Sequence, residues 1–265
     1  MNTKITSITE MKKINRKIVM LTCYDASMSK IFSNSDVDVL LVGDTLGMVK
    51  LGYENTLSVT IEDMIHHTKA VKRGNTGNKL IVADMSYKTY EDNPKEAVIN
   101  AKKLIDAGAD AVKVEGGEEI LPSIKEIIKA GIAVVGHLGL LPQSVEKTGG
   151  FKVQCRDEES AKKLYKDSLL LQDAGVCMIV FECIPENVAK DTAEKLTIPV
   201  IGIGAGKYCD GQVLVSDDML GMFSDFTPKF VKKYANLSPV IEEAVRSYAY
   251  EVRAGIFPQK ENSYK

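Results

Sequence analysis

Acidic side chains close several short apolar runs of this 265-residue chain. Asp44, Asp84 and Glu115 each stand at or just after the end of a run rich in Val, Leu and Ile. Carboxylate oxygens are the ligands that a hard cation such as Mg2+ prefers, and a cation would offset the repulsion among them. The pattern predicts a metal site formed by these three residues, although each acid taken alone is more typical of a helix cap or a salt bridge.

Basic side chains occupy comparable positions. Lys113 stands two residues before Glu115, and side chains two apart on a strand share a face. Lys113 would therefore steady an anionic substrate; a Schiff base is the alternative, but nearby carboxylates favour its ammonium form. His137 ends another apolar run and is either a substrate-binding residue or a hydrogen-bonded histidine of the core.

Glu182 is the candidate for proton transfer. Its neighbours on both sides are apolar, in the sequence Val-Phe-Glu-Cys-Ile. A carboxylate in an apolar setting is a stronger general base than one in water. We therefore expect Glu182 to act as a proton acceptor rather than as a fourth metal ligand.

Eight short apolar runs must position these side chains. They are too short for helices, and they lack the polar alternation of a half-exposed sheet. They lie at residues 18–23, 37–43, 80–83, 111–115, 132–137, 177–182, 199–204 and 212–215. The segments between them have helical periodicity: Asn93 and Pro94 are typical of a helix start, and Gly108, Gly131 and Gly175 of helix ends.

The succession of strand, helix, glycine and strand predicts a parallel sheet covered by helices. The chain is about as long as an α/β protein of the (β/α)8 TIM-barrel type, which takes roughly 250 residues. We therefore expect a single barrel domain over residues 1–265, with a short polar tail from about residue 258. The C-terminal ends of barrel strands share one cavity, so the polar residues should converge there.

A doubly wound open sheet is the rival architecture, because residues 202–206 read GIGAG. The dinucleotide fingerprint G-x-G-x-x-G requires a glycine where Lys207 stands, and it normally follows the first strand of its unit. These glycines therefore indicate a close backbone approach at the barrel rim rather than a nucleotide site.

Composition excludes several classes of function. A formal net charge of -2 gives no reason to expect nucleic acid or an acidic membrane as a partner. The five cysteines are an odd number and include no C-x-x-C pair, which argues against a disulfide framework or a thiolate zinc site and favours a reducing cytoplasm. The N-terminal segment lacks the apolar stretch of a signal peptide, and no run approaches the roughly 20 apolar residues of a membrane helix.

Several longer motifs carry a resemblance to a known family. They are TCYDASMSKIF, DVLLVGDTLGMV, IEDMIHHTKAVKRG, IVADM, AVKVEGG, GHLGLLPQSV, GGFKVQ, IGIGAG and CDGQVLVSDDMLG. In this order, from about residue 18 to 234, they closely resemble the ketopantoate hydroxymethyltransferase family. The resemblance implies a (β/α)8 barrel, one Mg2+ per subunit, and a homodecamer built as a pentamer of dimers. It also implies transfer of a hydroxymethyl group from 5,10-methylenetetrahydrofolate to 3-methyl-2-oxobutanoate, on the way to pantothenate and coenzyme A.

The resemblance also implies roles for individual residues. Asp44, Asp84 and Glu115 would surround the metal, and Glu182 would be the proton acceptor. The residues expected to contact the oxo acid are Asp44, Thr45, Asp84, Lys113 and His137. Thr45 stands where the family usually has serine, and it keeps the hydroxyl group. A metal that chelates the oxo acid would stabilise the enolate formed when its C3 proton leaves.

Two other functions fit parts of the pattern. One is a Mg2+-dependent lyase or mutase of the phosphoenolpyruvate mutase and isocitrate lyase type, which shares the barrel and enolate chemistry but does not use folate. The other is a catalytically silent barrel that only binds oxo acids. The intact acids at Asp44, Asp84, Glu115 and Glu182 count against the silent barrel.

Overall fold

The computed structural model describes residues 3–144, 150, 152–223 and 227–264. Internal contacts divide the chain into two compact units, one that ends at Val215 and one that begins at Ser216. The strands lie in the first unit, and the described residues of the second unit contain helices and no strand. That the whole chain forms a single domain stays a prediction.

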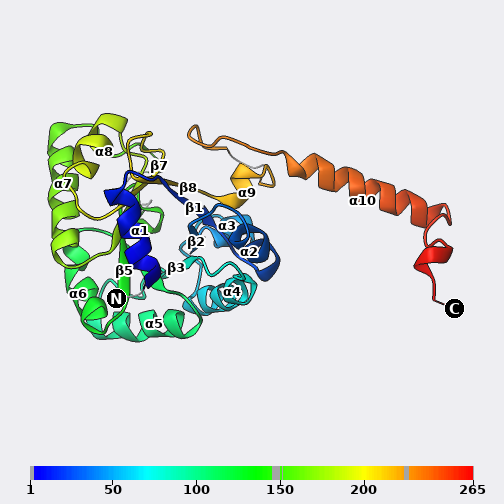
Figure 1. Cartoon of the computed structure of the whole chain (residues 1–265), viewed down its shortest axis with the longest axis horizontal. Coiled ribbons are helices and arrows are strands. Elements are labelled where there is room, and N and C mark those ends of the chain that lie inside the picture. Colours follow the sequence, from blue (N-terminus) through cyan, green and yellow to red (C-terminus); the bar gives the residue numbers. More distant parts are fainter. Residues whose placement is uncertain (1–2, 145–149, 151, 224–226, 265) are drawn as a thin grey trace. The chain divides into compact units, whose positions relative to one another are not determined.

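In the described part of the first unit, eight parallel strands form a closed barrel in chain order (Figure 1). They are β1 (Ile18–Thr22), β2 (Val39–Val42), β3 (Leu80–Asp84), β4 (Ala111–Glu115), β5 (Ala133–Gly139), β6 (Met178–Glu182), β7 (Val200–Ile203) and β8 (Gly211–Leu214). Strand β8 pairs with β1 and closes the barrel. The predicted (β/α)8 barrel is confirmed, and each observed strand lies within about two residues of its predicted run.

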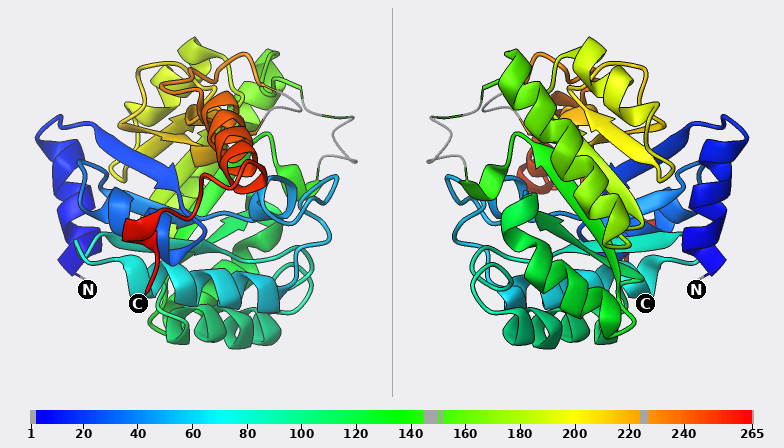
Figure 2. Two further views of the ribbon diagram at one scale, coloured as in Figure 1. Left: turned by 90° about the vertical axis from the view of Figure 1, so that its right-hand side faces the viewer. Right: turned by 90° about the vertical axis from the view of Figure 1, so that its left-hand side faces the viewer.

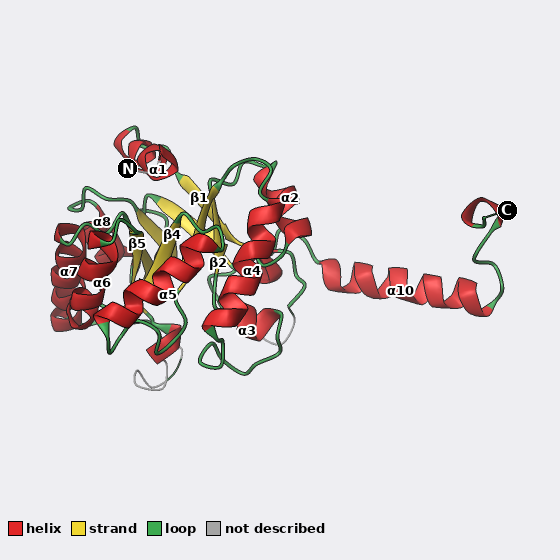
Figure 3. Cartoon of the chain, turned by 90° about the horizontal axis from the view of Figure 1, so that it is seen from below, coloured by secondary structure: helices red, strands yellow, loops and turns green. Residues whose placement is uncertain are grey.

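Helices surround the strands, as Figures 2 and 3 show for the first unit. They are α2 (Ala26–Ser33), α3 (Leu46–Val49), α4 (Ile61–Gly74), α5 (Pro94–Asp106), α6 (Leu121–Lys129), α7 (Glu158–Asp173) and α8 (Glu186–Ala193). Two short 3-10 turns, η1 (Glu118–Ile120) and η2 (Pro142–Ser144), belong to the loops after β4 and β5. Most of the strand residues are buried, since they face either the barrel interior or the covering helices.

The predicted helix boundaries are also present. The Asn93 side chain accepts hydrogen bonds from the backbone N–H groups of Lys95 and Glu96, and Pro94 opens α5. Gly108, Gly131 and Gly175 follow α5, α6 and α7 with φ of 114°, 83° and 97°. Glycine adopts this left-handed conformation without steric cost, so each helix stops directly before the next strand.

Helix α1 (Thr3–Lys13) closes the N-terminal end of the barrel. Its apolar residues Ile5, Ile8 and Met11 belong to the same buried cluster as the inward side chains of the strands. Lys4 Nζ lies 2.8 Å from Asp110 Oδ2, and Lys12 Nζ lies 2.8 Å from Asp210 Oδ2. Because one end is filled in this way, the opposite, C-terminal end is left for chemistry.

The second unit contains α9 (Ser216–Met219), α10 (Leu237–Arg253) and the 3-10 turn η3 (Lys260–Asn262). Helix α10 is amphipathic, and its apolar side chains are exposed. No described helix of the chain is long and apolar enough to cross a membrane.

Candidate active site

The site is formed by side chains that point into the barrel. Successive side chains of a strand point to opposite faces, so every second residue points inward. In β3, Leu80 and Val82 belong to the interior cluster, and Asp84 is the next residue on that face. In β4, Ala111 belongs to the cluster, and Lys113 and Glu115 follow it on the same face. His137 in β5 and Glu182 in β6 continue the same pattern beyond Val135 and Val180. On the inward face of β3 to β6, the side chains are therefore apolar toward the N-terminal end of the strand and charged or polar toward its C-terminal end.

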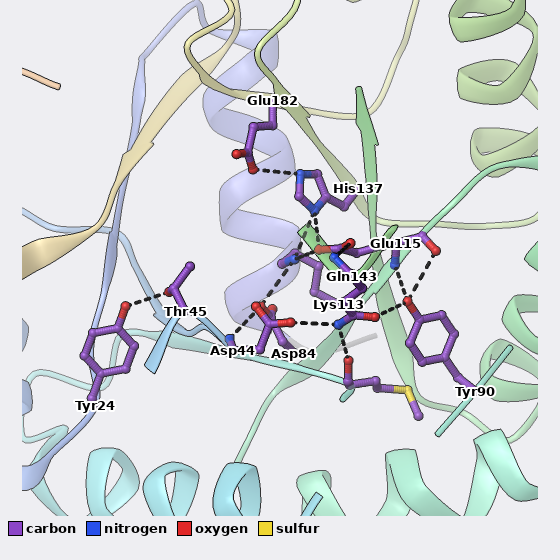
Figure 4. A network of polar contacts seen from close by, with 11 residues as sticks. Tyr24, Asp44, Thr45, Asp84, Tyr90, Lys113, Glu115, His137, Gln143 and Glu182 are labelled. Atoms are coloured by element: carbon purple, nitrogen blue, oxygen red, sulfur yellow. Dashed lines mark hydrogen bonds and ion pairs between the residues drawn. The ribbon is translucent and has the colours of Figure 1, made fainter. Parts of the chain in front are cut away.

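These charged groups line one cavity at the C-terminal end of the barrel (Figure 4). The structure brings together every site residue that the sequence predicted, namely Asp44, Thr45, Asp84, Lys113, Glu115, His137 and Glu182. Strand register explains their proximity, because Asp84 is paired with Lys113 and Glu115 with His137.

Gly43 continues the inward pattern of β2 without a side chain. A Cβ atom there would lie 3.1 Å from Thr45 Oγ1 and 3.6 Å from Asp84 Oδ2. The first distance is shorter than an ordinary contact and the second is ordinary, so a larger residue at position 43 would press mainly on the Thr45 hydroxyl. Glycine therefore leaves room for the Thr45 hydroxyl at the cavity wall.

Lys113 stands among the carboxylates. Its Nζ lies 3.3 Å from Asp84 Oδ2 and 3.8 Å from Glu115 Oε1, and its side chain is 5% exposed. Burial by itself would lower the pKa of Lys113, but Asp84, Glu115 and Asp44 outweigh burial and raise that pKa. Lys113 is therefore an ammonium ion, suited to binding an anion and poorly suited to nucleophilic attack.

The carboxylates of Asp44 and Asp84 are held close together. Burial, followed by the charges of Asp84 and Glu115, raises the pKa of Asp44 well above its usual value. Burial also raises the pKa of Asp84, against the opposing effects of Lys113 and of the Asp44 backbone N–H, which donates to Asp84 Oδ2 at 3.0 Å. A divalent cation would relieve this repulsion.

His137 connects Glu115 to Glu182. Its Nδ1 lies 3.1 Å from Glu115 Oε1 and 3.2 Å from Lys113 Nζ, and its Nε2 lies 3.2 Å from Glu182 Oε2. Burial and Lys113 lower the pKa of His137, but Glu115 and Glu182 outweigh them and raise it to about 8. Burial opposes ionisation of Glu115, yet His137 and Lys113 lower its pKa overall. Glu182 therefore lies beside an imidazole and is not surrounded by apolar groups alone.

Thr45 is oriented from the opposite side of the cavity. Its Oγ1 lies 2.8 Å from the hydroxyl oxygen of Tyr24, which follows β1. The Tyr24 ring is buried, at 2% exposure. The threonine hydroxyl is thus fixed at the cavity wall, where it can contact a ligand.

The carboxylates of the site fit a hard cation for two reasons. They supply oxygen ligands, and one of their oxygen atoms has no hydrogen-bond partner. Asp84 Oδ1 is buried, and in the structure it has no hydrogen-bond partner, an arrangement that is costly unless a ligand completes it. Among the described residues, no three acidic, histidine or cysteine side chains already stand where they could hold a metal ion together.

Sequence comparison identifies the family of the chain. The profile of the family described as ketopantoate hydroxymethyltransferase matches residues 2–260. The chain belongs to this family. Its membership confirms the resemblance carried by the motifs, and of these motifs GHLGLLPQSV and GGFKVQ extend partly outside the described residues.

Similar members of the ketopantoate hydroxymethyltransferase family span the whole chain. A 3-methyl-2-oxobutanoate hydroxymethyltransferase of Clostridium botulinum (strain 657 / Type Ba4) is 53% identical over 266 residues, covering 100% of this chain and 96% of the relative. One of Desulfotalea psychrophila is 50% identical over 265 residues, covering 100% and 95%. One of Caldicellulosiruptor saccharolyticus is 53% identical, covering 98% and 99%.

Solved structures with the same fold have much lower sequence identity to this member of the ketopantoate hydroxymethyltransferase family. A phosphonopyruvate hydrolase solved with oxalate and Mg2+ has a TM-score of 0.63 at 12% identity, covering 98% of this chain and 93% of the other. A 2,3-dimethylmalate lyase of the PEP mutase/isocitrate lyase superfamily has a TM-score of 0.60 at 14% identity, covering 98% and 92%. At these identities the likeness establishes the barrel fold alone.

The sequence analysis did not predict two buried polar residues that contact the site of this ketopantoate hydroxymethyltransferase family member. Gln143 lies in η2, after β5, and Tyr90 lies in the loop between β3 and α5. Both contact Glu115, and Gln143 also contacts Asp44. Their loops carry no strand periodicity, so only the Pro-Gln-Ser turn after β5 hinted at a polar group near the site.

Proposed function

We propose that this chain acts as a 3-methyl-2-oxobutanoate hydroxymethyltransferase. It would transfer a hydroxymethyl group from 5,10-methylenetetrahydrofolate to 3-methyl-2-oxobutanoate, giving ketopantoate for pantothenate and coenzyme A synthesis. The observation that carries the proposal is 53% identity along the entire chain to relatives of that name. The cavity supports it with the carboxylates, ammonium group and imidazole that enolate chemistry requires.

One Mg2+ per subunit would be held by Asp44, Asp84 and Glu115. It would supply electrostatic stabilisation of the negative charge that develops on the keto oxygen of the substrate. The support is the oxygen-only set of side chains and the unsatisfied Asp84 Oδ1.

The oxo acid would be oriented by groups of both signs. The Lys113 ammonium would offset the negative charge of the substrate, and the Thr45 hydroxyl, held by Tyr24, would donate a hydrogen bond. Asp44, Asp84 and His137 would complete the contacts from the cavity wall. Because these groups are held by buried contacts, little reorganisation accompanies binding.

Glu182 would act as the proton acceptor at the reacting centre. Its carboxylate lines the cavity, and Oε2 lies 3.2 Å from His137 Nε2, close enough for an ion pair when the imidazole is protonated. When a proton leaves the substrate, the electron pair of the broken bond remains as an enolate. The enolate carbon then forms the new bond to the one-carbon unit of the folate cosubstrate. Both C–N bonds that join this unit to the folate break, which leaves tetrahydrofolate, and water supplies the hydroxyl oxygen of ketopantoate.

Three further proposals concern assembly, compartment and partners. We expect a homodecamer built as a pentamer of dimers, as the resemblance implies, and the exposed apolar side chains of α10 support self-association. We also expect a cytoplasmic location, because all five cysteines are free thiols in the structure. The small-molecule substrates would be its ligands, with no nucleic acid or membrane partner.

A direct assay tests the proposed activity. Purified protein is incubated with 3-methyl-2-oxobutanoate, Mg2+ and 5,10-methylenetetrahydrofolate, and ketopantoate is measured. Glu182→Gln should lower kcat at least about 100-fold because the proton acceptor is lost, while metal binding persists. Asp84→Asn should lower turnover and also weaken metal binding.

The control for this assay is Glu158→Gln. Glu158 is an exposed residue of α7 that pairs only with Lys162 among its described contacts, so its replacement should leave turnover unchanged. Wild-type rates in both Glu182→Gln and Asp84→Asn would refute the site. Turnover of the oxo acid that proceeds equally well without folate would instead favour a lyase or mutase.

A further inference from the structure

The side chain of Gln143 connects the proposed metal ligands from outside the cavity. Its Nε2 donates to Asp44 Oδ2 at 2.8 Å and to the carbonyl oxygen of Met85 at 2.9 Å. Its backbone N–H donates to Glu115 Oε2 at 3.0 Å. One residue therefore contacts Asp44, Glu115 and the residue directly after Asp84.

Tyr90 fixes the orientation of the Gln143 amide. The Tyr90 hydroxyl lies 2.8 Å from Gln143 Oε1, to which it donates, and it accepts a hydrogen bond from the Glu115 backbone N–H at 3.0 Å. The Met85 carbonyl oxygen can accept a hydrogen bond but cannot donate one. The amide nitrogen of Gln143 must therefore face Met85, and its amide oxygen must face Tyr90. Reversing the amide would place its oxygen against two acceptors, Asp44 Oδ2 and the Met85 carbonyl oxygen.

Both side chains are buried and lie behind the ligands. Tyr90 is 2% exposed and Gln143 is 4% exposed. Neither is among the described residues that line the cavity, whereas Asp44 and Glu115 are. In Figure 4, Gln143 lies between Asp44 and Tyr90, beside Glu115. Their hydrogen bonds therefore hold the carboxylates without occupying space that a substrate or cation would need.

We propose that Gln143 and Tyr90 are positioning residues that orient the carboxylates of Asp44 and Glu115 toward the bound cation. The inference rests on the proposed function, since it assumes that these carboxylates hold Mg2+. By holding Asp44 Oδ2 and Glu115 Oε2, the pair limits the rotation of both groups. Partners of this kind set the direction and basicity of metal-binding side chains, and their loss typically weakens metal affinity about 10- to 100-fold.

Metal titration of the full chain tests the inference independently of turnover. Mn2+ binding is followed by electron paramagnetic resonance, and Mg2+ affinity is obtained by competition. Gln143→Met keeps the length of the side chain but removes its amide, and should weaken both affinities about 10- to 100-fold. Tyr90→Phe removes only the hydroxyl and should weaken them in the same direction.

The control is Gln172→Met. The Oε1 atom of Gln172, in α7, accepts from the backbone N–H of Thr197 at 2.7 Å, and Gln172 is not among the described residues of the cavity. Its replacement removes an amide with a comparable structural role, so stability falls while metal affinity stays at the wild-type value. Raising Mg2+ should restore turnover in Gln143→Met, which general damage to the fold would not allow.

Two results would overturn the inference, and they are distinguishable. Wild-type affinity in both Gln143→Met and Tyr90→Phe rejects the positioning role alone. Absence of Mn2+ and Mg2+ binding in the wild-type protein rejects the metal site itself, and with it that part of the proposed function. If Gln143→Met does not fold, the affinity of Tyr90→Phe decides the question.

Discussion

Buried charges dominate the site at the scale of single residues. The carboxylates of Asp44, Asp84, Glu115 and Glu182 outnumber the basic groups that face them. Such an excess of buried acid is costly, and enzymes keep it where a cation or a proton transfer makes use of it. The opposite pKa changes of Asp44 and Glu115 follow from their neighbours, because His137 and Lys113 favour the charged form of Glu115.

The sequence indicated the strand-end acids but not how they are held. Asp84, Lys113 and Glu182 could be predicted, because each lies at or near the end of a short apolar run and the C-terminal ends of barrel strands share one cavity. Tyr90 and Gln143 could not, because their contacts depend on how two loops fold over the barrel. The contact between His137 and Glu182 likewise depends on the pairing of β5 with β6, which no local pattern encodes.

The cysteines give a prediction about pH. Burial raises the pKa of Cys23, Cys177 and Cys183 to about 12 and that of Cys155 and Cys209 to about 11. A raised pKa means less thiolate at a given pH, so iodoacetamide should alkylate the native protein at pH 8 at least about 100-fold more slowly than the denatured protein. The native rate should rise as the pH approaches 11. Equal rates for native and denatured protein at pH 8, measured by mass spectrometry, would contradict this.

At the scale of elements, the barrel strands were predictable and their exact ends were not. Strand β5 was expected to end at His137, but it continues to Gly139 because Leu138 and Gly139 pair with Phe181 and Glu182 of β6. The helix starts and ends marked by Asn93 and Gly108 could be read locally, since capping and left-handed glycine are local effects.

Helix α10 carries the element-scale prediction. Its exposed apolar residues include Val240, Ile241, Val245, Tyr248 and Val252. Exposed apolar side chains in such number are typical of a protein interface. Val245→Asp should therefore lower the mass of the assembly in sedimentation velocity, because a charge would be buried without a partner.

Glu243→Gln is the control for α10. Glu243 pairs with Arg246, its side chain is 69% exposed, and its loss should leave the assembly intact. Circular dichroism verifies that the helix persists in both variants. A wild-type mass for Val245→Asp would show that this residue lies outside any interface.

At the scale of the whole molecule, the barrel supplies a platform and the strand ends supply the chemistry. Chains at 12% and 14% identity share the fold, which illustrates that the barrel alone does not determine a reaction. The site residues, together with full-length identity of 53% to named hydroxymethyltransferases, are what favour enolate formation followed by one-carbon transfer. The cation-assisted loss of the C3 proton is the central step of this account.

Proton exchange measures that step without folate. In D2O, wild-type protein with Mg2+ should exchange the C3 proton of 3-methyl-2-oxobutanoate for deuterium, observed by NMR as loss of the C3–H signal. Removal of the cation by a chelator should stop the enzymatic exchange, and added Mg2+ should restore it. Two results would contradict the account. One is an exchange rate in the presence of protein and Mg2+ that is no higher than the rate in buffer, and the other is an exchange rate that the chelator does not change.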